Sequence, residues 1–162
     1  MVDGKPDAAR EPLRLVCFHL RQQELALPIA HVRESLRMRP ITRVFLTPPW
    51  MAGIFSLRGD IVPAIDLAPW LGLPRTIAGD DSRIVVIQGA GKTVGILVDR
   101  LSELRTLDPA TLAAPPPTLT PEVATLLHGV AATSTGPVQV LDPAALFRSD
   151  RMRALARSEV TT

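Results

Sequence analysis

The chain has 162 residues, of which 46% are hydrophobic, and this suits one domain or two small lobes that share a core. The formal net charge is only +2, and there is no tyrosine and one cysteine, so the sequence pI of 9.3 does not indicate a nucleic-acid partner. The polar start of the chain lacks the apolar core of a signal peptide, and no apolar run approaches the roughly 20 residues of a membrane helix. We therefore expect a cytoplasmic protein without a segment inserted in the membrane.

The first quarter of the chain predicts a tail, a hairpin and a short helix. Residues 1–12 are polar and predict a disordered N-terminal tail. Residues 13–20 and 24–29 predict two strands around the turn "RQQ", because apolar residues alternate along the first of them. Residues 30–36, "AHVRESL", predict a short helix, and residues 40–45, "PITRVF", are rich in residues that favour strands.

The stretch "IFSLRGDIVPAIDL", residues 54–67, predicts a hairpin whose turn is Arg58–Gly59. Gly59 supplies the positive φ that a tight hairpin turn needs. Pro63 lacks an N–H group, so part of the second strand is expected to have a free edge. Asp66 then predicts an N-cap for the helical turn "LAPWLGL".

The second half of the chain predicts strands with short helical turns between them. Residues 74–82 form a polar linker, and Asp108 and Asp142 each precede a proline as helix caps. The predicted strands are 83–88, 92–101, 102–107, a segment from Leu127 to Thr133, and 136–141. A C-terminal helix or tail follows over 148–162. Many short strands with only short helices predict a mainly β barrel architecture.

Two segments share the order strand, aspartate cap and short helix. They are "VPAIDLAPWL", residues 62–71, and "VQVLDPAALF", residues 138–147. This similarity indicates two related lobes.

The sequence offers little catalytic chemistry, and we expect no enzyme, cofactor or metal site. None of the three histidines, at positions 19, 31 and 128, has metal-ligand spacing with another histidine or cysteine. Cys17 lies among apolar neighbours and is expected to be a small buried residue. No Gly-x-Ser-x-Gly elbow is present, and "GAGK" at 89–92 lacks the spacing of a phosphate loop. A nucleic-acid stacking surface needs exposed aromatic side chains. The chain has only four phenylalanines and two tryptophans, and most of them lie in apolar runs.

Arg58 admits three interpretations: part of a cell-adhesion tripeptide, a catalytic cation, or a buried structural charge that also serves a binding surface. Adhesion needs an extracellular setting, which the chain does not suggest. A partly desolvated guanidinium needs an acidic partner. Asp60 would lie across the hairpin tip, so Glu34, between Val32 and Leu36, is the better candidate. The alternative is that Glu34 and Arg58 are both ordinary solvated side chains.

The order of several motifs resembles the CheW-like domain, the chemotaxis coupling protein family. The similarity spans residues 13–147, and "LRGDIVPAIDL" is its most specific part. The other matching motifs are "VRE", "ITRV", "TPPWMAGI", "VGILVD", "LSEL", "LHGVA" and "VQVLDPAALF". The resemblance implies one domain of two intertwined, five-stranded SH3-like barrels around a shared core.

The resemblance also implies a function without chemistry. Such proteins are adaptors that bind the regulatory domain of a CheA-type histidine kinase and the cytoplasmic tip of methyl-accepting chemoreceptors. By motif match, the residues implied in receptor binding are Val32, Glu34, Gly53, Arg58 and Val98, the last on a strand of the second lobe. The residues implied in kinase binding are Phe45, Leu46 and Trp50, and their alternative role is core packing.

The sequence departs from the family pattern in ways that concern partner choice. Ser56 stands where asparagine is common before Leu-Arg-Gly, and Ala52 stands where a basic residue is common before Gly53. The alternative function is therefore a CheW-like scaffold of a non-flagellar pathway, for twitching motility or a second messenger, that binds a different regulator.

Overall fold

The computed structural model describes residues 11–154, and in that range it is mainly β, as predicted. The strands are β1 Leu13–Leu20, β2 Gln23–Pro28, β3 Val32–Arg37, β4 Met51–Leu57, β5 Asp60–Ile65, β6 Arg83–Gly89, β7 Lys92–Val98, β8 Arg100–Leu107, β9 Leu127–Thr133 and β10 Gly136–Leu141. The helices are short: η1 Ile29–His31, α2 Leu67–Trp70, η2 Pro109–Thr111, α3 Pro121–Ala124 and α4 Pro143–Arg148.

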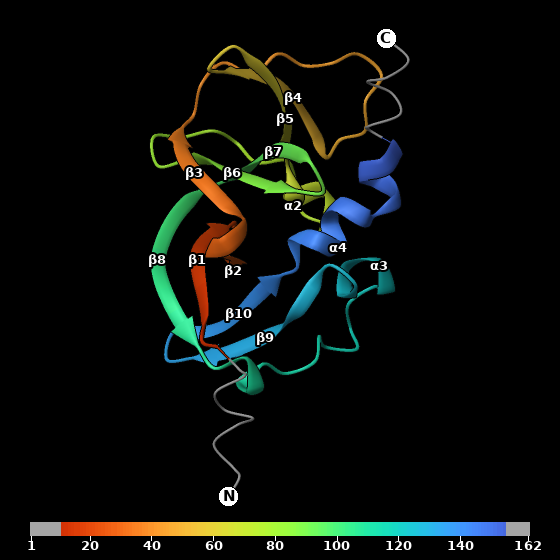
Figure 1. The fold of residues 1–162 in the computed structure, drawn as a ribbon. Coiled ribbons are helices and arrows are strands. Elements are labelled where there is room, and N and C mark those ends of the chain that lie inside the picture. The colour runs from red at the N-terminus through yellow and green to blue at the C-terminus, as the bar shows by residue number, and fades with distance from the viewer. Residues whose placement is uncertain (1–10, 155–162) are drawn as a thin grey trace, which may run out of the picture.

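The strands form two five-stranded sheets, each curled into a small barrel (Figure 1). Barrel I has the strand order β3-β6-β7-β5-β4, and barrel II has the order β8-β1-β2-β10-β9. In barrel I an isolated bridge joins Thr42, after the edge strand β3, to Ile54 of the other edge strand, β4. In barrel II the equivalent bridge joins Ala113, after β8, to Val130 of β9. Closing a sheet in this way removes its exposed edges.

The chain exchanges hairpins between the barrels. The hairpin β1–β2 begins the chain but belongs to barrel II, and β6–β7, which follows β5, completes barrel I (Figure 1). The only parallel pairs in residues 11–154 join the exchanged hairpins to their hosts, β7 to β5 and β2 to β10. Each barrel therefore contains a hairpin from one half of the chain and three strands from the other half.

A shared core lies between the barrels. Its buried members come from both, among them Phe18, Leu25 and Leu27 of barrel II and Ile65 and Ile96 of barrel I. Smaller apolar clusters fill the interior of each barrel. Because neither barrel covers this layer alone, the hydrophobic effect holds the two together.

The similarity between residues 62–71 and 138–147 corresponds to a repeat in three dimensions. Asp66 caps α2 and Asp142 caps α4, each after the strand that carries the parallel pairing. The backbone N–H of Asp66 donates to Trp50, and that of Asp142 donates to Leu126, each at 2.7 Å. The prediction of two related lobes is thus correct, and all three predicted caps, including Asp108, are present.

The helix predicted over residues 30–36 is wrong. Only Ile29–His31 is helical, in one 3₁₀ turn, and Val32 begins strand β3. Along β3, half-buried residues alternate with exposed ones, and Ser35 and Leu36 pair with Val85 and Ile84 of β6. A period of two is that of a strand, and pairing with β6 overrides the helix propensity of a short segment.

Residues 40–45 do not form the strand that their composition predicts. Thr42 alone pairs, with Ile54, and the chain then leaves the barrel in turns. Pro40 at the start of residues 40–45 and Pro48 and Pro49 in the loop that follows lack a backbone N–H, which limits the pairing of this part of the chain.

Most of the predicted tail 1–12 and half of the predicted segment 148–162 lie outside the described residues. In the described part of the segment 148–162, residues 150–154 are helical, and Met152 is buried in the shared core. No helix in the range 11–154 is long and apolar enough to span a bilayer.

Candidate partner-binding surface

Glu34 and Arg58 form a bidentate ion pair at one end of barrel I. The two guanidinium nitrogens of Arg58 donate to the two carboxylate oxygens of Glu34 at 2.5 and 2.7 Å. Arg58 and Gly59, with φ of 50° and 87°, make the turn between β4 and β5, the conformation of a tight hairpin. Glu34 comes from the opposite edge strand, β3, so the pair links the two edges of the sheet.

The ion pair is more exposed than the sequence suggested. The Arg58 side chain is 63% exposed and that of Glu34 is 22% exposed. The hydrogen bonds from Arg58 lower the pKa of Glu34, and the carboxylate raises the pKa of Arg58. The edge of the guanidinium that carries its two terminal nitrogens holds the carboxylate, and the rest of this exposed side chain is accessible to a partner.

A groove of about 380 Å³ begins at Arg58 and follows the gap between β5 and β7. These parallel strands pair only at Ala64 and Ile65 of β5, so the preceding residues of β5 face the groove. The free edge predicted at Pro63 is therefore present. The groove is lined by Arg33, Leu57, Arg58, Asp60, Ile61, Val62, Pro63, Lys92, Thr93, Val94 and Met152.

Three other residues that the resemblance implies in receptor binding occupy supporting positions. Val32 is half-buried and packs against the shared core. Gly53 is buried in β4, where a Cβ atom would meet the Thr42 carbonyl oxygen at 2.3 Å. Val98 is fully buried in β7, and it lies in the same sheet as Glu34 and Arg58 instead of in the other lobe. This corrects its predicted location.

The residues implied in kinase binding separate into two kinds. Phe45 and Leu46 lie at the tip of the loop before β4 and are 89% and 92% exposed. Trp50 is only 6% exposed and packs in the shared core, where its ring centroid lies 5.2 Å from that of Trp70. For Trp50, core packing is the alternative that the structure shows.

The apolar tip is held in a defined shape. The Thr47 hydroxyl donates to the Val44 carbonyl at 2.7 Å, and Leu46 has a φ of 61°. A left-handed conformation costs a non-glycine residue roughly 1–2 kcal/mol. A turn with this local strain presents two apolar side chains to solvent, and strained turns with exposed apolar side chains are typical of binding sites.

The side chains of the described residues that could ligate a metal or act as a nucleophile do not form a reactive site. Among residues 11–154 no three His, Cys, Asp or Glu side chains lie close enough to share a metal ion. Cys17 is 1% exposed, and burial raises the pKa of its thiol to about 11. At neutral pH the thiol is protonated and inaccessible, so it is not a nucleophile.

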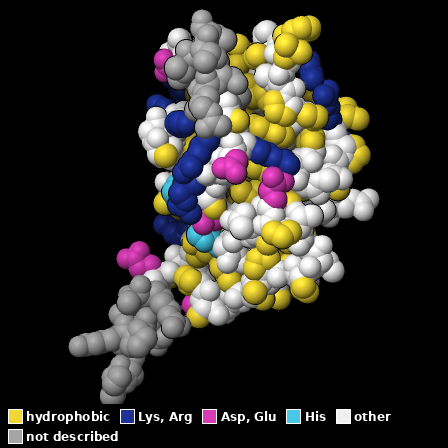
Figure 2. Space-filling model, turned by 90° about the vertical axis from the view of Figure 1, so that its right-hand side faces the viewer, with side chains coloured by type: hydrophobic (Ala, Val, Ile, Leu, Met, Phe, Trp, Pro, Cys, Tyr) yellow, Lys and Arg dark blue, Asp and Glu magenta, His cyan; other side chains and the backbone are white. Residues whose placement is uncertain are grey.

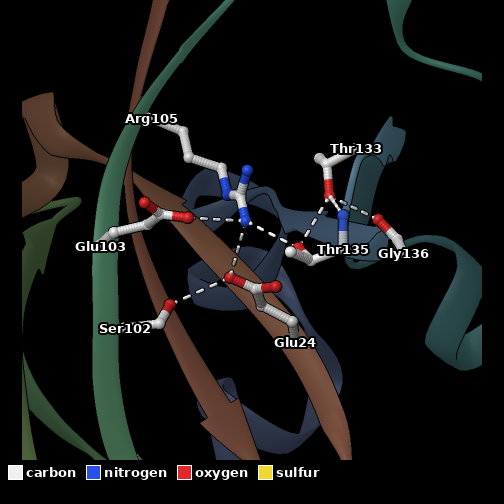
Figure 3. Close-up of polar contacts among 7 residues, drawn as sticks. All are labelled: Glu24, Ser102, Glu103, Arg105, Thr133, Thr135 and Gly136. Carbon is white, nitrogen blue, oxygen red and sulfur yellow. Dashed lines mark hydrogen bonds and ion pairs between the residues drawn. The ribbon is translucent and has the colours of Figure 1, made fainter.

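A second arginine cluster in barrel II was not predicted (Figure 3). Arg105 of β8 lies 2.8 Å from a Glu103 carboxylate oxygen and 3.6 Å from one of Glu24, and it donates to the Thr135 hydroxyl at 3.0 Å. Ser102 donates to Glu24 at 2.9 Å. The Arg105 side chain is only 16% exposed, whereas that of Glu103 is 59% exposed, so the cluster is buried at the arginine and open to solvent at one carboxylate.

This cluster occupies the place in barrel II that the ion pair occupies in barrel I. Arg105 lies on the edge strand β8 as Glu34 lies on β3, and Thr135 lies in the turn of the last hairpin as Arg58 does in its own. The residues come from strands far apart in the sequence, and no local motif marks them. In barrel I the exposed charge is the Arg58 guanidinium, whereas in barrel II it is the Glu103 carboxylate.

The fold and this surface define a partner-binding module of two β barrels in which the exposed features are an ion pair beside a groove and an apolar loop tip. The family model of the CheW-like domain matches residues 14–151, and the chain belongs to this family. The resemblance noted in the sequence is therefore confirmed.

Similar proteins support the assignment along nearly the whole chain. A chemotaxis protein CheW from Treponema pallidum is 28% identical over 150 residues, which cover 90% of this chain and 88% of that protein. Protein FrzA from Myxococcus xanthus is 28% identical over 151 residues, covering 92% and 94%. The crystal structure of scaffolding protein TtCheW from Thermoanaerobacter tengcongensis superposes with a TM-score of 0.77 at 29% identity, covering 87% of this chain and 91% of that one.

Proposed function

We propose that this protein is a chemosensory adaptor that couples a CheA-type histidine kinase to methyl-accepting chemoreceptors, with no catalysis of its own. The observation that carries the proposal is a CheW-like fold with two separate exposed surfaces in barrel I, the Arg58 groove and the Phe45–Leu46 tip. Two surfaces on one small, rigid body suit a protein that holds two partners at a fixed geometry. The relatives named above as a chemotaxis protein and a scaffolding protein support this function.

The receptor tip is assigned to the surface around Arg58. Arg58 and Glu34 are the exposed members of the set implied in receptor binding, and they would make the contact. Val32, Gly53 and Val98 would act indirectly, by fixing the positions of β3, β4 and β7. The protein would act in the cytoplasm, next to membrane-bound receptor arrays.

The regulatory domain of the kinase is assigned to the apolar tip. Exposed aromatic and aliphatic side chains on a rigid turn are effective anchors, because little conformational entropy is lost when they bind. Phe45 and Leu46 have this property, whereas Trp50 is buried in the shared core.

The test is calorimetric titration of the protein against the regulatory domain of each CheA-type kinase encoded in its genome. Wild-type protein should bind one of them with micromolar or tighter affinity. The double variant Phe45→Ser with Leu46→Ser should weaken this binding at least about tenfold without loss of stability, since both side chains are exposed. The matched control is Ile77→Ser, an apolar residue that is 76% exposed on another loop, and it should bind as wild type.

A second candidate function is a CheW-like scaffold of a non-flagellar pathway that binds a different regulator. The departures at Ala52 and Ser56, both on strand β4 that leads to the Arg58 turn, and the similarity to FrzA favour it. The same titration separates the two functions. Binding to none of the kinases by a folded protein would reject the coupling function and leave the scaffold.

A further inference from the structure

The turn that follows α4 is fixed to both barrels by one arginine. Residues 150–154 are helical, and Arg151 lies within them. Its guanidinium is 2.6 Å from a carboxylate oxygen of Glu122 in α3, which precedes β9 of barrel II, and 4.9 Å from the centre of the Trp70 ring in α2, which follows β5 of barrel I. Figure 2 views the molecule from the side of α3 and α4 and shows acidic and basic side chains next to each other on this face.

This attachment places Met152 in the groove that begins at Arg58. Met152 is 3% exposed, belongs to the shared core and lines the groove. Leu57, Val62 and Val94, each also buried, complete the apolar floor. Because β5 and β7 do not pair along this stretch, the space between them is filled from the C-terminal turn and not by backbone hydrogen bonds.

The rim of the groove is basic. Arg33, Arg58 and Lys92 lie on it, against the carboxylate of Asp60 and that of Glu34, which pairs with Arg58. An apolar floor with a cationic rim is complementary to an apolar segment flanked by carboxylates, because the rim charges favour approach of negative charge and the floor gains from burial.

We infer that the C-terminal turn, held by Arg151 on Glu122 and Trp70, forms one wall of the Arg58 groove through Met152 and thereby determines its affinity for an apolar, acidic segment of the receptor tip. The occupant rests on the proposed function, whereas the attachment of the turn rests on contacts within the chain. The C-terminal turn is then a specificity element of the adaptor, although it lies far along the chain from Glu34 and Arg58.

The first test measures binding of cytoplasmic tip fragments of the chemoreceptors encoded in the same genome, by calorimetry at two salt concentrations. Arg151→Ala and Met152→Ala should each weaken binding about fivefold or more, and Met152→Leu should restore it, because leucine fills the same space. Affinity of the wild type should fall as salt rises, as expected for a basic rim and an acidic segment.

Two controls separate the groove from general stability. Arg153→Ala removes an exposed charge from the same turn, and Leu146→Ala removes a buried side chain of α4 that does not line the groove. Both should bind as wild type, although Leu146→Ala should lower the melting temperature. If Leu146→Ala weakens binding as much as Met152→Ala, the effect is one of stability and the inference is overturned.

The second test needs no receptor. Amide hydrogen exchange of Lys92–Val94, at the groove edge of β7, should be faster in Arg151→Ala than in Arg153→Ala, because the turn that covers this edge is released. If Arg58→Ala abolishes receptor binding while Arg151→Ala and Met152→Ala bind as wild type, the proposed function stands and this inference is wrong. If wild-type protein binds no receptor fragment, the receptor part of the proposed function fails and the occupant inferred here fails with it. Unchanged exchange in Arg151→Ala would overturn the attachment itself.

Discussion

Gly53 and Thr42 are in contact through their backbones. The Thr42 N–H donates to the Ile54 carbonyl at 2.9 Å, the Ile54 N–H donates to the Thr42 carbonyl at 2.8 Å, and a Cβ atom on Gly53 would stand 2.3 Å from the Thr42 oxygen. Gly53 also has a φ of 150°, a backbone conformation that residues with a side chain rarely adopt. This contact closes barrel I and fixes the start of the loop that carries Phe45 and Leu46. The structural role of Gly53 is therefore to allow this close approach of the two backbone segments.

Gly53→Ala should lower the free energy of unfolding by about 2–4 kcal/mol, because the added methyl group meets a backbone atom that cannot move away without opening the bridge. Chemical denaturation measures this. Gly72→Ala is the control, since Gly72 also has a positive φ, 82°, but open space at its Cβ, so it should cost only about 1–2 kcal/mol. Equal losses in the two variants would show that the contact with Thr42 is unimportant.

Asp66→Ala should destabilise the protein more than Asp142→Ala, although the two residues occupy equivalent places in the repeat. Asp66 accepts three hydrogen bonds, from the Ala68 N–H at 3.1 Å and from the N–H and hydroxyl of Thr76 at 2.8 Å each. Its removal leaves donors unpaired in a buried site and should cost about 2–4 kcal/mol. Asp142 accepts one capping bond, from Ala145 at 3.3 Å, and its removal should cost about 0.5–1 kcal/mol. Thermal unfolding of both variants would reveal the difference, and the reverse order would contradict it.

The pair of Glu34 and Arg58 should contribute to stability at neutral pH and lose that contribution in acid. Arg58 lowers the pKa of Glu34 below the ordinary 4.5, so the folded state holds the charged carboxylate better than the unfolded state does. The contribution is therefore fully present above pH 4.5 and declines as the pH falls through the lowered pKa. Melting temperatures of wild type and Glu34→Gln should differ slightly at pH 7, because the pair is exposed, and should converge in acid. A difference that grows on acidification would contradict this account.

Glu34→Gln and Arg58→Ala should both weaken receptor binding while leaving the fold intact. The side chains meet at the surface, so their loss opens no cavity. Titration with a receptor tip fragment, together with circular dichroism of each variant, tests this. Unchanged affinity in Arg58→Ala would show that the guanidinium makes no contact with the receptor.

Cys17 should not react with thiol reagents in the folded protein. Its side chain is buried and its pKa is raised to about 11, so at pH 8 almost no accessible thiolate is present. Labelling with an aromatic disulfide reagent should proceed only at the rate of unfolding, and it should become fast in denaturant. Rapid labelling in buffer alone would show that strand β1 opens locally.

Much of the fold could be predicted from local patterns. Strand β1, the glycine turn at Gly59 and the three aspartate caps depend on residues near one another in sequence, and each is present. The partnership of Glu34 with Arg58 was predicted as well, although the prediction assumed a partly desolvated guanidinium and the Arg58 side chain is 63% exposed. The errors occurred where tertiary contacts outweigh local preference. Strand β3 pairs with β6, whereas "AHVRESL" by itself favours a helix.

The sequence by itself determined the class of fold, the turns, the caps and the ion pair, since these depend on the covalent limits of glycine and proline, on capping geometry and on charge. Tertiary structure alone decided which hairpin completes which barrel, that Val98 and Trp50 are buried while Phe45 and Leu46 are exposed, and that Met152 lines the groove. Apolar residues look alike along a chain, and whether they face a core or a partner depends on which distant strands cover them.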